Sequence, residues 1–180
     1  MKRLSAALAL ALLGVGLASA TTVIPMSVED LTNASEHVVQ ARAVEQWSEW
    51  SPNHGLILTF TRFQVIKTLK GAVPATFVVK QLGGQVANQR THVAGVRYFS
   101  SNEEAVLFLH PAMAKDSTYV ITGLMQGNFH VDRSGGAATV TNGVPGAHTL
   151  STASHSVSGY QGSHMTLDEL QTRVRQAVSR

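Results

Sequence analysis

The sequence contains no cysteine, so neither a disulfide framework nor a thiolate metal site can hold the fold together. Charged residues make up only 14% of the chain, and its 14 lysines and arginines are scattered singly along it. A nucleic-acid-binding protein concentrates basic residues on one face or in one stretch. We therefore expect a domain that is stabilised by its hydrophobic core, and we do not expect it to bind nucleic acid.

The first twenty residues have the pattern of a secretory signal. Lys2 and Arg3 precede an apolar run over residues 4–17, and the small-residue triplet Ala18-Ser19-Ala20 follows. This run is shorter than the roughly 20 apolar residues that span a bilayer. The sequence thus predicts removal of residues 1–20 and export of a chain that begins at Thr21. We expect that chain to be periplasmic or secreted, without stable insertion in a membrane.

The exported chain has the length of one ordinary domain. Ser27 followed by acidic residues predicts a short helix near the start, and Thr166 with Glu169 predicts a second helix at the end. Between them the pattern is that of strands and turns. We expect a barrel domain over residues 21–141, a flexible segment rich in Gly, Ser, Thr and His over 142–164, and a C-terminal helix over 165–180.

Strand patterning predicts a small barrel. The stretch Leu56–Leu69 carries apolar residues on both sets of alternate positions, as a coiled strand of a small barrel does. The apolar run Ala105–Leu109 is typical of a central strand that is buried on both faces. Residues 85–102 are polar and suggest a long connection. The expected fold class is mainly β: a small closed or partly open barrel with one helix at each end.

Few patterns in the sequence indicate catalysis. No serine lies in a G-x-S-x-G setting, and the eight histidines include no H-E-x-x-H pair. Glu103 and Glu104 are adjacent, so on a strand they point to opposite faces, and a solvated turn is their simpler interpretation. His148, His155 and His164 fall in the flexible segment. We therefore expect a binding protein rather than an enzyme, with no metal and no cofactor; an enzyme with an unfamiliar site is a further alternative.

Two tryptophans offer a binding surface. Trp47 and Trp50 lie near the end of a predicted strand, and together with Tyr98 and Phe99 they can form an aromatic platform for a ligand. Alternatively, these aromatic side chains pack in the barrel core or at a packed edge of the sheet and bind no ligand. The first interpretation predicts an envelope-associated or ligand-binding module that uses exposed aromatic residues.

The new N-terminus suggests a different partner. Three segments follow one another at a recognisable spacing. They are the N-terminal strip Thr21-Thr22-Val23-Ile24-Pro25, a strand that begins Ser35-Glu36-His37-Val38-Val39, and the strand end Lys67-Thr68-Leu69-Lys70-Gly71. This layout over residues 21–71 resembles the tissue inhibitors of metalloproteinases, which contain a netrin-like OB-type barrel.

The resemblance implies a protein partner, and the partner that it indicates is a zinc metalloprotease. By analogy, the amino group and carbonyl of Thr21 would chelate the protease zinc and Thr22 would enter the adjoining pocket, while Val23, Ile24 and Pro25 would lie along the cleft. The family fixes this strip with disulfides, and their cysteines are missing here. Because ordering a residue costs about 1–2 kcal/mol, another tether is needed for tight inhibition.

Overall fold

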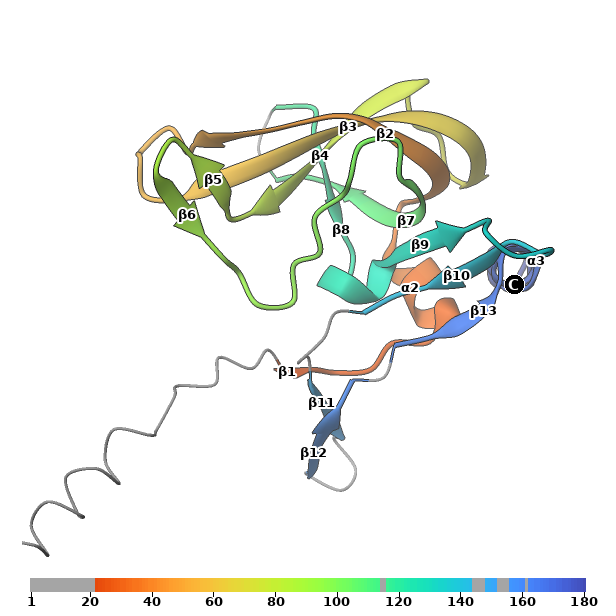
Figure 1. The fold of residues 1–180 in the computed structure, drawn as a ribbon. Helices are drawn as coiled ribbons and strands as arrows, with labels where there is room; N and C mark the ends of the chain where they lie inside the picture. The colour runs from red at the N-terminus through yellow and green to blue at the C-terminus, as the bar shows by residue number, and fades with distance from the viewer. Residues whose placement is uncertain (1–21, 114–115, 144–147, 152–155, 161) are drawn as a thin grey trace, which may run out of the picture.

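The computed structural model describes residues 22–113, 116–143, 148–151, 156–160 and 162–180, and Figure 1 shows their arrangement. Thr21, the predicted chelating residue, and the predicted signal over 1–20 lie outside these residues. None of the helices within the described ranges is both long and apolar enough to cross a membrane.

Five strands close into a barrel. Antiparallel pairs join β7 to β2, β2 to β3, β3 to β4 and β7 to β8, while a parallel pair between β4 and β8 completes the ring. The barrel strands are β2 (His37–Trp50), β3 (Ile57–Lys70), β4 (Thr76–Leu82), β7 (Glu104–Pro111) and β8 (Tyr119–Ile121). A five-stranded mixed barrel of this kind confirms the predicted mainly β, OB-like fold class.

The sheet continues past the barrel on the free edge of β7. There β9 (Asn128–Asp132), β10 (Thr139–Thr141) and β13 (His164–Thr166) add one after another. The two faces of β2 and β7 consequently serve two cores. The barrel interior is built around Phe63, Phe77 and Leu107, and the second core, around Leu31, Phe108 and Leu170, lies under the helices. Ala105–Leu109 is buried throughout, as predicted.

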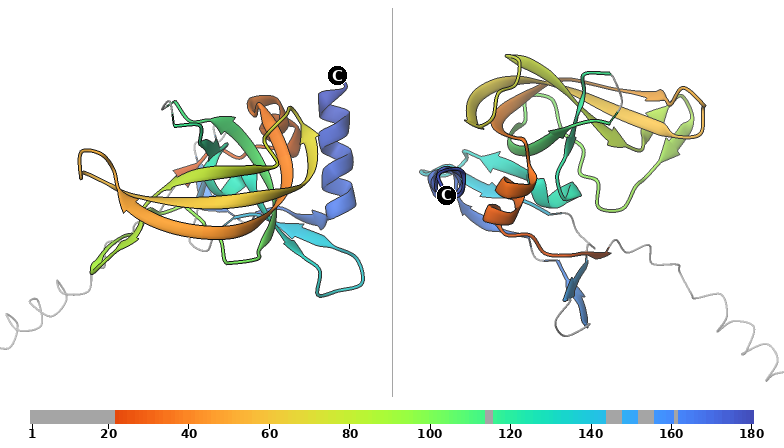
Figure 2. Two further views of the ribbon diagram at one scale, coloured as in Figure 1. Left: turned by 90° about the horizontal axis from the view of Figure 1, so that it is seen from above. Right: turned by 180° about the vertical axis from the view of Figure 1, so that it is seen from behind.

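Both predicted helices are present, with the expected caps. In α2 (Val28–Ala34) the Ser27 side chain and Asp30 form a reciprocal capping box, and in α3 (Leu167–Val178) the Thr166 hydroxyl accepts from the Glu169 amide at 3.1 Å. Figure 2 shows α3 at the opposite end of the molecule from the β2–β3 tip. Val178, in the last turn of α3, is 48% exposed.

A bulge in β2 decides which side chains face the barrel interior. Up to Ala43, odd-numbered residues of β2 point inward; the register then shifts between Ala43 and Glu45, and Val44 is left outside at 41% exposure. A bulge adds one residue to a strand and so exchanges its faces beyond that point. As a result Trp47, opposite Phe60, lies outside the barrel, whereas Ser48, opposite Thr59, lies inside.

Two segments contain more structure than the sequence predicts. Residues 85–102, read as a connection, begin with a small hairpin of β5 (Gly84–Val86) and β6 (Gln89–Thr91). Residues 142–164, predicted to be flexible, include β11 (His148–Ser151) and β12 (Ser156–Gly159), which pair with each other. The remaining elements are the two-residue strand β1 (Thr22–Val23), which pairs with β11, and the 3-10 helix η2 (Leu124–Gly127).

Candidate binding sites on the barrel

An open groove of about 680 Å³ runs over the outer face of β3 and β4. Loop 51–56, which joins β2 to β3, bounds one part of it, and the connection from β7 to β8 bounds another through Asp116 and Thr118. Figure 2 shows the β2–β3 tip extending beyond the rest of the sheet. The described lining residues are Trp47, Glu49, Trp50, Pro52, Leu58, Phe60, Arg62, Val78, Lys80, Asp116 and Thr118.

Aromatic rings form the floor of this groove. Trp47 and Phe60 stack across the strand pair with ring centroids 5.5 Å apart, and the Arg62 guanidinium lies 5.4 Å from the Trp47 ring centroid. An offset stack and a cation–π contact both hold the indole in one orientation. Trp50 contributes from the end of β2, where its ring is tilted 37° against His54. Both tryptophans therefore belong to one surface, and Tyr98 and Phe99 do not line it.

The charges in the groove neutralise one another. Arg62 pairs with Glu45 on the neighbouring strand, and Lys80 pairs with Asp116. The hydrogen bond from Lys80, aided by the Thr118 hydroxyl, lowers the pKa of Asp116 from 3.8 to about 2. With both cations paired, the described lining residues offer no unbalanced positive charge to attract a polyanion.

Loop 51–56 is fixed by its own polar groups. The Ser51 hydroxyl donates to Asn53 Oδ1 at 2.7 Å and accepts from the Leu56 amide at 3.1 Å, while the Ser51 and Leu56 backbones are also hydrogen-bonded. These bonds close the turn that the Pro-Asn-His-Gly sequence predicts. The rim of the groove beside Trp50 is therefore an ordered turn.

The predicted N-terminal strip is separate from the groove and has a tether of its own. Gln126, only 2% exposed, accepts from the Met26 amide at 2.8 Å and donates to the Ile24 carbonyl at 3.0 Å. Thr22 and Val23 pair in parallel with His148 and Thr149 of β11. Ile24 is 60% exposed and Pro25 is also exposed. One buried amide thus fixes the backbone of a strip that presents apolar side chains to solvent.

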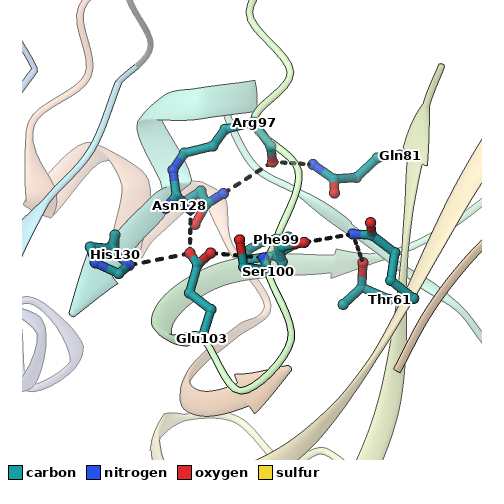
Figure 3. A network of polar contacts seen from close by, with 9 residues as sticks. Thr61, Gln81, Arg97, Phe99, Ser100, Glu103, Asn128 and His130 are labelled. Carbon is teal, nitrogen blue, oxygen red and sulfur yellow. Dashed lines mark hydrogen bonds and ion pairs between the residues drawn. The ribbon is translucent and has the colours of Figure 1, made fainter. Parts of the chain in front are cut away.

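The adjacent carboxylates are buried rather than solvated, which corrects the sequence interpretation. The Glu103 side chain, 7% exposed, pairs with Arg97 and accepts from the Ser100 amide at 2.9 Å, and it lies 3.3 Å from His130 Nδ1. Figure 3 shows the rest of this network, in which the Arg97 carbonyl accepts from Gln81 and Asn128. These contacts fix segment 97–103 across the barrel strands.

Glu104 points to the opposite face, as expected of its neighbour on a strand. Its carboxylate accepts from Arg133 at 2.7 and 3.1 Å and from Gln40 at 2.6 Å, and it pairs with Arg42 at 3.3 Å. The hydrogen bonds from Arg133 are the main reason that the pKa of Glu104 lies below its usual value, despite the opposing effect of burial. The two carboxylates therefore serve separate networks and do not converge on one bond.

No protein-family model matches the chain, and no curated protein is similar to it in sequence. The resemblance to the tissue inhibitors of metalloproteinases rests on the residues quoted above. Across the described ranges, histidine, aspartate and glutamate nowhere gather in a group of three or more able to hold a metal ion. What the protein binds must accordingly be argued from its surfaces.

A second cavity, of about 170 Å³, lies where β4 and β8 diverge beyond their single parallel pair. Its walls are mostly aliphatic, with Leu82, Val120 and Leu124 among them, and such walls give a ligand little to fix its orientation. The aromatic groove is larger and combines stacking surfaces with charged groups. It is the better candidate for specific recognition.

The sequence identifies Trp47 and Trp50 in the groove, but not Phe60 and Arg62 beside them. It likewise identifies the N-terminal strip, but not Gln126, which holds the strip in place. Phe60 lies in the predicted strand 56–69, but only the register with β2 places it beside Trp47. Gln126 is 102 positions from Ile24, and no local pattern connects them.

Proposed function

We propose that this protein is an exported, non-catalytic binding protein whose ligand lies in the outer groove of the barrel. The observation that carries the proposal is the position of Trp47 and Trp50 in one open groove on the face of β3 and β4. OB-type barrels bind chain-like ligands on the face of their second and third strands, between the first and fourth connecting loops. In chain order those strands are β3 and β4 here, and the loops are 51–56 and 112–118.

The groove also favours a class of ligand. An extended molecule with flat apolar faces gains stacking on the indoles, as an oligosaccharide or an aromatic-rich peptide does. Glu49 and the two ion pairs supply hydrogen-bonding groups along the groove, and together these described residues carry no net positive charge. This balance supports the expectation that nucleic acid is not the ligand, because polyphosphate binding requires uncompensated cations.

Intrinsic fluorescence provides a direct test, because both tryptophans of the chain line the groove. The exported chain is titrated with neutral oligosaccharides and with aromatic-rich peptides. We expect a saturable change in emission with one of these two classes. Replacing Trp47 or Trp50 by alanine should weaken binding about tenfold or more, as loss of a central aromatic anchor does.

Leu56→Ala is the matched control, because Leu56 is 53% exposed in the same loop and does not line the groove. Its affinity should equal that of the natural chain. The melting temperature of Trp50→Ala should remain close to that of the natural chain. Unchanged affinity in both tryptophan variants would rule out the groove as the binding site.

A second candidate is recognition of a protein partner of the zinc metalloprotease class through the N-terminal strip. The specific observation in its favour is a pair of hydrogen bonds, in which the Gln126 side chain accepts from the Met26 amide and donates to the Ile24 carbonyl. They provide a tether of the kind that the missing cysteines would otherwise supply. The exposed side chains of Ile24 and Pro25 could then lie along a protease cleft.

The amino terminus of the exported chain tests this second function. Titration against zinc metalloproteases should show inhibition that is lost when one residue is added before Thr21 or when its amine is acetylated. The added residue moves the amino group away from the zinc position, and an acetylated amine has no lone pair available to bind zinc. Inhibition that survives both changes would exclude chelation by Thr21. The groove variants Trp47→Ala and Trp50→Ala should inhibit as well as the natural chain.

A further inference from the structure

The inner face of the barrel changes from apolar to polar at one end. Towards the middle, the inward positions carry Ala43, Phe63 and Val79, all in the buried core. Beyond the bulge the inward positions of β2 are Gln46 and Ser48, and the residues opposite them on β3 are Thr61 and Thr59. Small barrels normally fill their interior with apolar side chains, and departures from such local rules occur mainly at functional sites.

These polar groups line a pocket of about 300 Å³ at the mouth of the barrel. Its volume is at the lower end of the range for ligand sites and suits a molecule with a single ring. The β5–β6 hairpin and the chain that follows it form one side. The described lining residues are Gln46, Ser48, Thr59, Gly84, Gln85, Arg90, Thr91, His92 and Tyr98.

The hydrogen bonds of the floor leave acceptor atoms available. The Thr59 hydroxyl donates to the Gly83 carbonyl at 2.7 Å, so the Ser48 hydroxyl, 2.9 Å away, donates to Thr59. The Tyr98 hydroxyl likewise donates to the Leu82 carbonyl at 2.7 Å. A hydroxyl whose proton is engaged still has lone pairs. Ser48 and Tyr98 can therefore accept hydrogen bonds from hydroxyl groups of a ligand.

Gly84 keeps the pocket open. An added Cβ at this position would lie 2.2 Å from the Thr59 hydroxyl and 2.5 Å from the Ser48 hydroxyl, and the backbone φ of 131° is a conformation that other residues rarely adopt. Glycine allows close approach of backbone to a ligand or to a second chain segment. A side chain here would occupy the space above both hydroxyls.

The charge at the rim is positive. Arg90 is the middle residue of β6, opposite Gln85 of β5, and His92 follows two residues later. Within the described ranges Arg90 has no carboxylate partner, and no aspartate or glutamate is among the lining residues. An unpaired guanidinium is suited to bind a carboxylate or phosphate.

We propose that the mouth of the barrel binds a small hydroxylated oxyanion of the size of one sugar ring, either a sugar acid or a sugar phosphate. The ring hydroxyls donate to Ser48 and Tyr98, and the anionic group pairs with Arg90. This site lies on the inner face of the strands whose outer face forms the aromatic groove, so it is independent of the proposed function.

The test is an NMR titration of the exported chain with glucuronate, glucose 6-phosphate and uncharged glucose. At least one anion should bind saturably and shift the amide signals of Ser48, Gly84 and Arg90, and glucose should bind at least about tenfold more weakly. Arg90→Gln should weaken anion binding about 10- to 100-fold, since a hydrogen bond to a charged group contributes about 1.5–3 kcal/mol.

Arg175→Gln serves as the matched control, because Arg175 is exposed on α3 and distant in sequence from the pocket. Its affinity for the anions should equal that of the natural chain. Absence of saturable binding by both anions, equal binding of glucose, or an Arg90→Gln variant that binds as tightly as the natural chain would overturn the proposal.

Discussion

Replacing Gln126 by leucine removes the side-chain amide that holds the N-terminal strip while keeping a side chain of similar length in the buried position. Two hydrogen bonds are lost, those to the Met26 amide and the Ile24 carbonyl. Each contributes about 0.5–1.5 kcal/mol net, so together they contribute about 1–3 kcal/mol. Because Ile24 is largely exposed, water can replace the lost partners, and the strip should open locally rather than unfold the barrel.

Hydrogen exchange of the Met26 amide measures this opening. A loss of about 1–3 kcal/mol corresponds to exchange that is about 5- to 150-fold faster in Gln126→Leu, with amides of the central strand β7 much less affected. Gln176→Leu, at an exposed position of α3, is the control and should leave Met26 unchanged. If Met26 exchanges at the natural rate in Gln126→Leu, the amide is not the tether and the N-terminal strip is held by other contacts.

Two further predictions concern stability. Phe63 is fully buried and packs against Phe77 and Phe99. Phe63→Ala should therefore lower the free energy of unfolding by about 3–5 kcal/mol in denaturant titrations, whereas Val178→Ala should change it little. A loss below about 1 kcal/mol in Phe63→Ala would contradict the placement of the core. Glu29 joins α2 to α3, and the hydrogen bonds from Arg173 lower its pKa from 4.5 to about 2. The folded state then binds the proton less readily than the unfolded state, so the contribution of Glu29 is present above about pH 4.5 and is lost as the pH falls towards 2. Melting temperatures of Glu29→Gln and the natural chain should therefore differ at pH 6 and converge near pH 2, and a constant difference would refute the linkage.

The parts of the fold that local patterns determine were predictable. A capping residue and an acid three positions later locate the start of a helix, and both ends of the chain carry that signal at Ser27 and Thr166. The run Ala105–Leu109 revealed the strand shared by the two cores, because only a strand covered on both faces is apolar at every position.

Contacts between distant residues were not predictable in this way. Gln126 reaches the N-terminal strip through tertiary structure, and its own neighbours in sequence give no sign of it. Glu103 and Glu104 resemble a solvated turn because charged residues are seldom buried, yet Arg97, six positions earlier, neutralises Glu103, and Arg133, just after β9, neutralises Glu104. The β5–β6 hairpin was missed because it is short and β6 is polar and fully exposed, which is also the composition of a loop.

The bulge at Val44 explains why the pattern of β2 was ambiguous and why the strand serves two surfaces. With uninterrupted alternation, Trp47 would lie on the same face as Ala41 and Ala43 and point into the barrel, as the core alternative for the tryptophans required. The extra residue at Val44 reverses the faces beyond it, so the indole joins Phe60 outside and Ser48 joins Thr59 inside. The aromatic groove and the polar mouth therefore have one structural cause, and neither would exist in its present form if β2 were a regular strand.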